Sequence, residues 1–159
     1  MKLVTVSIGG LEVSAERDAT IITHGLGSCI AVLTYDPIAR VAGMLHFQLP
    51  TSTLSPERAR ETPGTFADTG IPLLFEKMYA LGAKKANIVV KVAGGGNFHG
   101  DSGTFDIGKR NYTMMRKIFW KAQVLIAAED CGGSRSRTAR LFVDTGQITI
   151  QSGSEVNPL

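Results

Sequence analysis

The sequence predicts a mixed α/β fold, of the α+β kind, in a single domain that spans residues 1–159. Two observations support this prediction. The first third of the chain is a series of short apolar and alternating runs, a pattern that favours strands. The rest of the chain alternates helix-like and strand-like segments. At 159 residues the chain can bury one sizeable core and needs no second module.

Strands dominate the chain before residue 50. Each run ends at turn-forming residues, such as the glycines at 9–10 and the Asp-Pro pair at 36–37, whose turn is short enough for a hairpin. The expected strand regions are residues 2–10, 11–16, 19–28, 29–37 and 40–50.

Residues 49–69 contain three prolines among small polar residues, which favours a mobile surface loop. Asp68 is then expected to cap a helix that has Pro72 in its first turn and ends at Gly82. A buried strand is expected at 86–96, an amphipathic helix at 109–123, and further strands at 124–133 and 137–152, the last region folding back on itself in a hairpin at 144–146.

Composition narrows the classes of function. The net charge is +3, and no run of five or more Lys or Arg residues offers a stripe for nucleic-acid phosphates, so no nucleic-acid partner is expected. No apolar stretch reaches the ~18 residues of a membrane-spanning helix, and the N-terminus lacks a secretory pattern. The chain is therefore expected to be cytoplasmic. Its two cysteines predict neither a disulfide nor a zinc site.

The stretch "THGLGSCIAV" at residues 23–32 raises the first question of chemistry. Glycines around Leu26 allow tight backbone bends, so the amides near Ser28 and Cys29 could point at a developing oxyanion, and Gly27, Ser28 and Gln48 are the candidates for this oxyanion and site loop. A strand or a short helix could follow, and only a helix would add its dipole to the thiol. From the residues alone, Cys29 is either a nucleophile or a small buried hydrophobe.

Three histidines are candidate bases: His24, His46 and His99. His46 lies in an apolar strand, where an imidazole is costly unless it is paired, and strand alternation puts Gln48 on the same face. Both could look into a site beside Cys29, although a histidine bonded to a backbone carbonyl fits the pattern equally well. Cys131 has no histidine near it in sequence and is expected to be structural. The glycines at 94–96 are expected to form a close-packed loop at the rim of the site.

Four blocks of sequence resemble one known family, the CheD chemoreceptor glutamine deamidases. They are "THGLGSC" followed by a histidine 17 positions after the cysteine, "ADTGIPLLFEKMYALGAKKANIVVKVAGGGN", "DIGKRN" and "AEDCGGS". The resemblance extends from about residue 20 to 150, and the four blocks follow the family's order, which makes the resemblance specific.

The resemblance implies a layered α/β/β sandwich, with an active-site arrangement similar to that of toxin deamidases of the cytotoxic necrotizing factor type. It assigns Cys29 as nucleophile, His46 as base and Thr23 as the group that orients the imidazole. We expect the imidazole to lie within bonding reach of a sulfur that is ionised at neutral pH. The implied reaction hydrolyses glutamine amides on the cytoplasmic helical domain of chemoreceptors through a thioester, with no metal or organic cofactor.

Other functions remain open at this stage. Some members of the family bind a CheC-type phosphatase, so a binding module with little or no hydrolysis is the main alternative, and a cysteine peptidase or acyl transferase could use the same dyad. The chain also departs from the family at His24, at His99, before Ala67 and in the segment "SRSRTAR". These departures bear on which protein surface it accepts.

Overall fold

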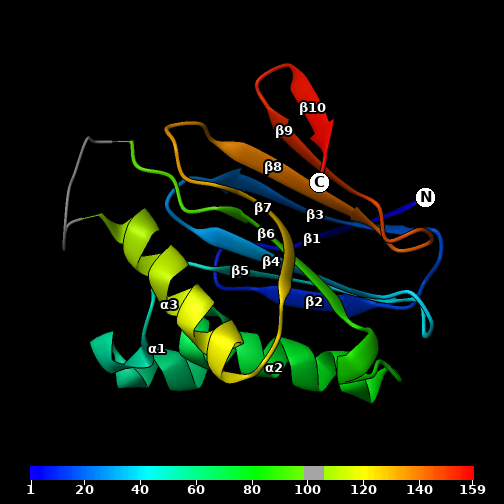
Figure 1. The fold of residues 1–159 in the computed structure, drawn as a ribbon, viewed down its shortest axis with the longest axis horizontal. Coiled ribbons are helices and arrows are strands. Elements are labelled where there is room, and N and C mark those ends of the chain that lie inside the picture. The colour runs from blue at the N-terminus through cyan, green and yellow to red at the C-terminus, as the bar shows by residue number, and fades with distance from the viewer. Residues whose placement is uncertain (99–105) are drawn as a thin grey trace.

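In the computed structural model, which describes residues 1–98 and 106–159, two five-stranded sheets and a set of helices form three layers (Figure 1). The first sheet has the order β1 (Lys2–Thr5), β3 (Ala19–Leu26), β8 (Arg137–Phe142), β9 (Ile148–Ser152) and β10 (Glu155–Pro158). The second has the order β2 (Leu11–Ser14), β5 (Val41–Phe47), β4 (Ile30–Asp36), β6 (Val89–Gly94) and β7 (Ile126–Cys131).

The helices cover the face of the second sheet that points away from the first sheet. They are α1 (Pro56–Glu61), α2 (Ala67–Ala80) and α3 (Ile107–Lys121), and short 3-10 turns lie at Ser52–Leu54, Pro63–Thr65 and Lys85–Asn87. None of the helices in the described residues is long and apolar enough to cross a membrane.

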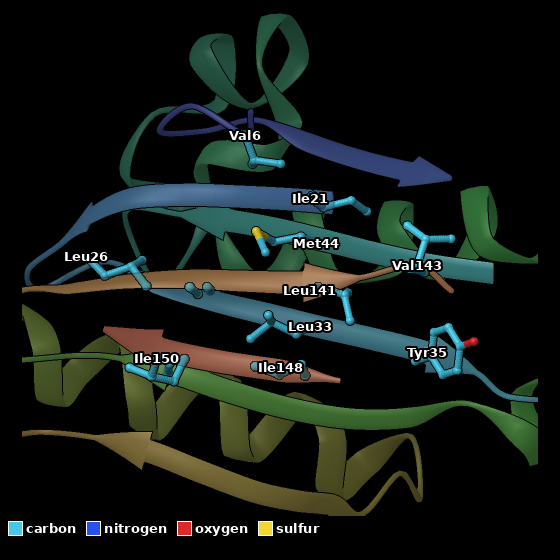
Figure 2. Close-up of a cluster of buried hydrophobic side chains, with 14 of the residues drawn as sticks. Val6, Ile21, Leu26, Leu33, Tyr35, Met44, Leu141, Val143, Ile148 and Ile150 are labelled. Carbon is cyan, nitrogen blue, oxygen red and sulfur yellow. The ribbon is translucent and has the colours of Figure 1, made fainter. Parts of the chain in front are cut away.

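Two hydrophobic clusters hold the three layers together. One lies between the sheets, where side chains such as Leu33, Met44 and Leu141 meet (Figure 2). The other lies between the second sheet and helices α2 and α3. Because the second sheet is the middle layer, its central strands β4 and β5 are buried at every residue. This is why their sequences are apolar almost throughout instead of alternating.

The predicted fold class and layered sandwich are confirmed. The 36–37 turn joins β4 to β5 as an antiparallel hairpin, and the 144–146 turn joins β8 to β9. Strand β6, helix α3 and strand β7 form a crossover between two parallel strands, with Gly94 opposite Cys131 at their carboxyl ends. Strand β10 has no counterpart in the prediction; it is an exposed edge strand that pairs with β9.

The prediction of a mobile loop at 49–69 is wrong, because helix α1 and two 3-10 turns occupy most of it. Pro56 stands at the first position of α1, where its missing N–H costs nothing. Asp68 does not cap α2: Phe66 holds the N-cap position, and the Asp68 carboxylate accepts from the Ser52 N–H at 2.9 Å and the Ser52 hydroxyl at 2.8 Å. The same carboxylate therefore fastens the segment to α2.

Candidate active site

Thr23, Cys29 and His46 come from three segments that meet between the two sheets. Thr23 lies in β3 of the first sheet and His46 in β5 of the second. Strand register places Ala31 of β4 opposite His46, and Cys29 precedes Ala31 by two residues. Cys29 packs in the hydrophobic cluster between the sheets, together with Ala31. The thiol and the imidazole therefore belong to diagonal positions on one face of the second sheet.

A hydrogen bond across the sheets fixes the imidazole of His46. The Thr23 hydroxyl lies 2.6 Å from the Val6 carbonyl, which can only accept, so the hydroxyl donates to it. The same oxygen lies 2.7 Å from Nδ1 of His46 and therefore accepts the Nδ1–H. This assigns the neutral tautomer in which Nε2 carries no proton and is available as a base. Thr23 and His46 are both fully buried.

The Nε2 atom of His46 is buried without a hydrogen-bond partner in the described residues. Burial lowers the pKa of His46 to about 4. Burial also raises the pKa of the Cys29 thiol, although the backbone N–H of Cys29 itself lowers it in part. At neutral pH the site thus holds a neutral thiol and a neutral imidazole. Our expectation of an ionised sulfur bonded to the ring is wrong for this state, because Cys29 is only 8% exposed and no cation among the described residues is paired with its thiol.

The segment before Cys29 bends sharply and leads into strand β4, so no helix dipole acts on the thiol. Gly25 has a φ of +64°, the left-handed conformation that glycine adopts freely. The carbonyls of Gly27 and Cys29 accept from the N–H groups of Gly96 and Gly95, at 2.9 and 2.8 Å. The Gly94–Gly96 loop therefore packs directly against residues 27–29, as expected for a close-packed loop at this place.

Gln48, predicted as part of the site loop, is half-buried, and its side-chain oxygen accepts from Arg58 at 2.8 Å. Sequence reasoning did not single out Asn111 of α3, whose side-chain amide donates to the carbonyls of Ser28 and Gln48. A signal was available. Asn111 falls at helical spacing between the buried residues Gly108 and Met115, and a polar residue on a buried helix face needs partners.

Neither His24 nor Cys131 shares the hydrogen bond that joins Thr23 to His46. His24 is exposed. Cys131 is half-buried at the end of β7, and burial together with Glu129 raises the pKa of its thiol to about 12. Both cysteines are free. His99 lies outside the described residues.

Burial of His46 predicts a pH-dependent loss of stability. Its pKa is about 4 in the folded protein against an ordinary 6.5, so between these values the unfolded chain binds a proton that the folded protein does not. The free energy of unfolding should therefore fall by about 3 kcal/mol from this group as the pH drops from 7 to 4. Urea unfolding of the wild type and of His46→Gln should give two curves that converge over this range, whereas a His24→Gln control should keep the wild-type slope. Parallel wild-type and His46→Gln curves would contradict this assignment.

The family model and the relatives described below all bear the name of one family, CheD. The family model CheD, described as chemotactic sensory transduction, matches residues 48–152. A "Probable chemoreceptor glutamine deamidase CheD 2" from Anaeromyxobacter dehalogenans is 61% identical over 159 residues, 100% of both chains. A CheD 1 of the same description from Syntrophus aciditrophicus is 50% identical over 149 residues, 94% of this chain and 93% of the relative. One from Methanococcus vannielii is 35% identical over 152 residues, 95% and 96% of the two chains.

The family model matches this chain from residue 48 onward, so the match does not include Thr23, Cys29 or His46. The alignment with the Anaeromyxobacter protein covers the whole chain and does include them. The layered sandwich, the family model and these relatives all lead to one assignment. This chain belongs to the CheD family.

Proposed function

We propose that this protein is a chemoreceptor glutamine deamidase, which hydrolyses glutamine side-chain amides on the cytoplasmic helical domain of chemoreceptors to glutamate. The relatives' names support the deamidase class. The observation that carries the proposal for this chain is the Thr23–His46 hydrogen bond, which leaves a buried, unprotonated Nε2 on the face that also bears the Cys29 thiol. A buried base that has no hydrogen-bond partner is free to accept the proton of a thiol that reacts beside it.

The first step begins from the neutral pair. As the Cys29 sulfur attacks the carboxamide carbon, its proton passes to Nε2 of His46 and the amide oxygen becomes an oxyanion. The imidazolium that forms keeps its Nδ1–H on the Thr23 hydroxyl. When the tetrahedral intermediate collapses, Nε2 returns the proton to the leaving nitrogen, the C–N bond breaks, and ammonia departs from a Cys29 thioester.

The second step hydrolyses the thioester, with water as the nucleophile and the Cys29 sulfur as the leaving group. Water attacks the thioester carbon while Nε2 of His46 takes one of its protons. Collapse breaks the C–S bond, the sulfur recovers the proton from Nε2, and the product is glutamate. Each proton has a donor and an acceptor among the protein, the substrate and water, so the scheme calls for no metal or organic cofactor.

The surface charge suits a helical, acidic receptor. Helix α3 carries five Lys or Arg residues and no acidic residue, on a chain of net charge +3. Such a helix would attract a negatively charged partner through its field. We place this reaction in the cytoplasm, and a CheC-type phosphatase, which some members of the family bind, is a candidate partner.

The test is to incubate the protein with a purified cytoplasmic receptor fragment and map the fragment by mass spectrometry. Deamidation adds about one dalton at individual glutamines and releases one ammonia per site. Tight binding of the fragment with no mass gain would instead support the binding module. Backbone cleavage or incorporation of an added amine would identify a peptidase or a transferase.

Thr23→Val should lower kcat/KM for deamidation by about 10²-fold, because valine keeps the shape of threonine but cannot accept the Nδ1–H of His46. Thr23→Ser, which keeps the hydroxyl, is the matched control and should stay within about threefold of the wild type. Initial rates of ammonia release measure both. Equal rates for the valine and serine variants would show that the hydroxyl does not orient the base.

A further inference from the structure

The backbone around the nucleophile has an asymmetric pattern of hydrogen bonds. The carbonyls of Gly27, Ser28 and Cys29 are all held, by the Gly96 N–H, the Asn111 side chain and the Gly95 N–H. The N–H groups of the same three residues donate to no backbone acceptor in the described residues, and the one contact recorded for them joins the Cys29 N–H to its own sulfur. A segment whose carbonyls are all occupied and whose N–H groups are bonded to no carbonyl is suited to bind an anion.

Asn111 is the only side chain in the described residues that makes one of these three bonds. It is fully buried, and its amide nitrogen donates to the Ser28 carbonyl at 3.0 Å and to the Gln48 carbonyl at 2.9 Å. Because both partners are carbonyls, the atom that faces them must be the NH₂ group. The Oδ1 atom, by contrast, is buried without a partner in the described residues. An unpaired buried acceptor costs free energy. The fold tolerates this cost at Oδ1 while the amide nitrogen donates its two hydrogen bonds.

The bond to Ser28 has a consequence for the next amide. In a trans peptide the C=O and the following N–H point in opposite directions. With the Ser28 carbonyl turned toward α3, the Cys29 N–H points away from the helix layer. The Cys29 N–H lies near its own sulfur, since it lowers the pKa of that thiol. The donor is therefore presented where the sulfur would attack.

We infer that Asn111 is a positioning residue that holds the Ser28–Cys29 peptide so that the Cys29 N–H stabilises the oxyanion of the tetrahedral intermediate. Its second bond, to the Gln48 carbonyl just after strand β5, holds the Asn111 side chain itself in place. This inference rests on the proposed deamidase function and extends it to a residue of the helix layer.

The test separates reactions that need an oxyanion donor from one that does not. Alkylation of Cys29 by iodoacetamide builds no oxyanion, whereas deamidation does. Asn111→Leu, which keeps the volume but removes the donors, and Asn111→Ala should lower kcat by about 10²-fold with KM within about threefold. The alkylation rate of Cys29, followed by peptide mass mapping, should stay within about threefold of the wild type. Asn157→Ala, on the exposed strand β10, is the control for loss of an asparagine.

A folded Asn111 variant with unchanged kcat would overturn the inference, and so would an alkylation rate that falls in step with kcat. If neither variant folds, the wild type decides. A receptor peptide with an aldehyde in place of the target carboxamide forms a tetrahedral adduct, and the Cys29 amide proton should move downfield in the NMR spectrum when it binds. No such shift would refute the role of this N–H. If the wild type deamidates no glutamine, the proposed function fails instead, a result distinct from these.

Discussion

Cys29→Ala should reduce deamidation of the receptor fragment to the uncatalysed rate, while Cys131→Ala retains full activity. The proposed scheme uses no other nucleophile, so loss of the sulfur removes both the attack and the thioester. Loss of a covalent nucleophile costs on the order of 10⁴-fold or more in comparable hydrolases. The rate of ammonia release and the mass gain at individual glutamines measure this loss.

Cys131 is a demanding control because it is also a free thiol close to the site. It lies opposite Gly94 in strand register and lines a cavity of about 290 Å³ together with Gly95. Its thiol has a pKa raised to about 12, so it is protonated at neutral pH, and it has no basic imidazole beside it in the described residues. Residual activity in Cys29→Ala that disappears in the double variant would show that Cys131 is the nucleophile and would refute the assignment.

Gly94→Ala should destabilise the fold and abolish activity together. Gly94 has a φ of +117°, and a methyl group there would overlap the carbonyl oxygen of Cys29. Neither backbone can give way, because the same carbonyl accepts the Gly95 N–H and Gly94 pairs with both Ile30 and Cys131. Overlap and backbone strain together should lower the free energy of unfolding by at least about 4 kcal/mol.

Gly132→Ala separates the cost of the overlap with Cys29 from the cost of the backbone strain. Gly132 also has a positive φ, +85°, but a methyl group there would meet no atom within 4 Å. Its cost should be the conformational strain alone, about 1–2 kcal/mol, with activity retained. Urea unfolding and deamidation rates of both variants test this pair. Equal losses of stability would show that the approach of Gly94 to Cys29 contributes nothing.

Much of the fold could be predicted because periodicity and turn residues act locally. The β4–β5 hairpin follows from the Asp-Pro turn at 36–37, and the end of α2 from Gly82, whose φ is +100°. Helix α1 was missed because the polar residues around Pro56 have the composition of a loop. What orders that segment is distant in sequence: the Asp68 carboxylate that binds Ser52. Strand β10 was missed because an exposed edge strand buries no face and so carries no alternation.

The site was predicted less completely than the fold. The residues themselves left Cys29 open between nucleophile and core, and Thr23 entered through the family resemblance alone. The ionisation state was wrong because it depends on burial from both sheets, which a local pattern does not contain. Asn111 was missed for a similar reason. Its two carbonyl partners lie 83 and 63 residues away in sequence.

The pairing of β3 with β8 also bears on the order in which the protein is made and folds. Thr23, Cys29 and His46 are all synthesised within the first third of the chain, yet Thr23 lies opposite Ala139 in the neighbouring strand. A nascent chain that ends before residue 137 has all three groups but only an incomplete first sheet to hold Thr23 against His46. Pairing over more than 100 residues is slow compared with local pairing. The contact between Thr23 and His46 should therefore form late, after translation has supplied β8 and β9.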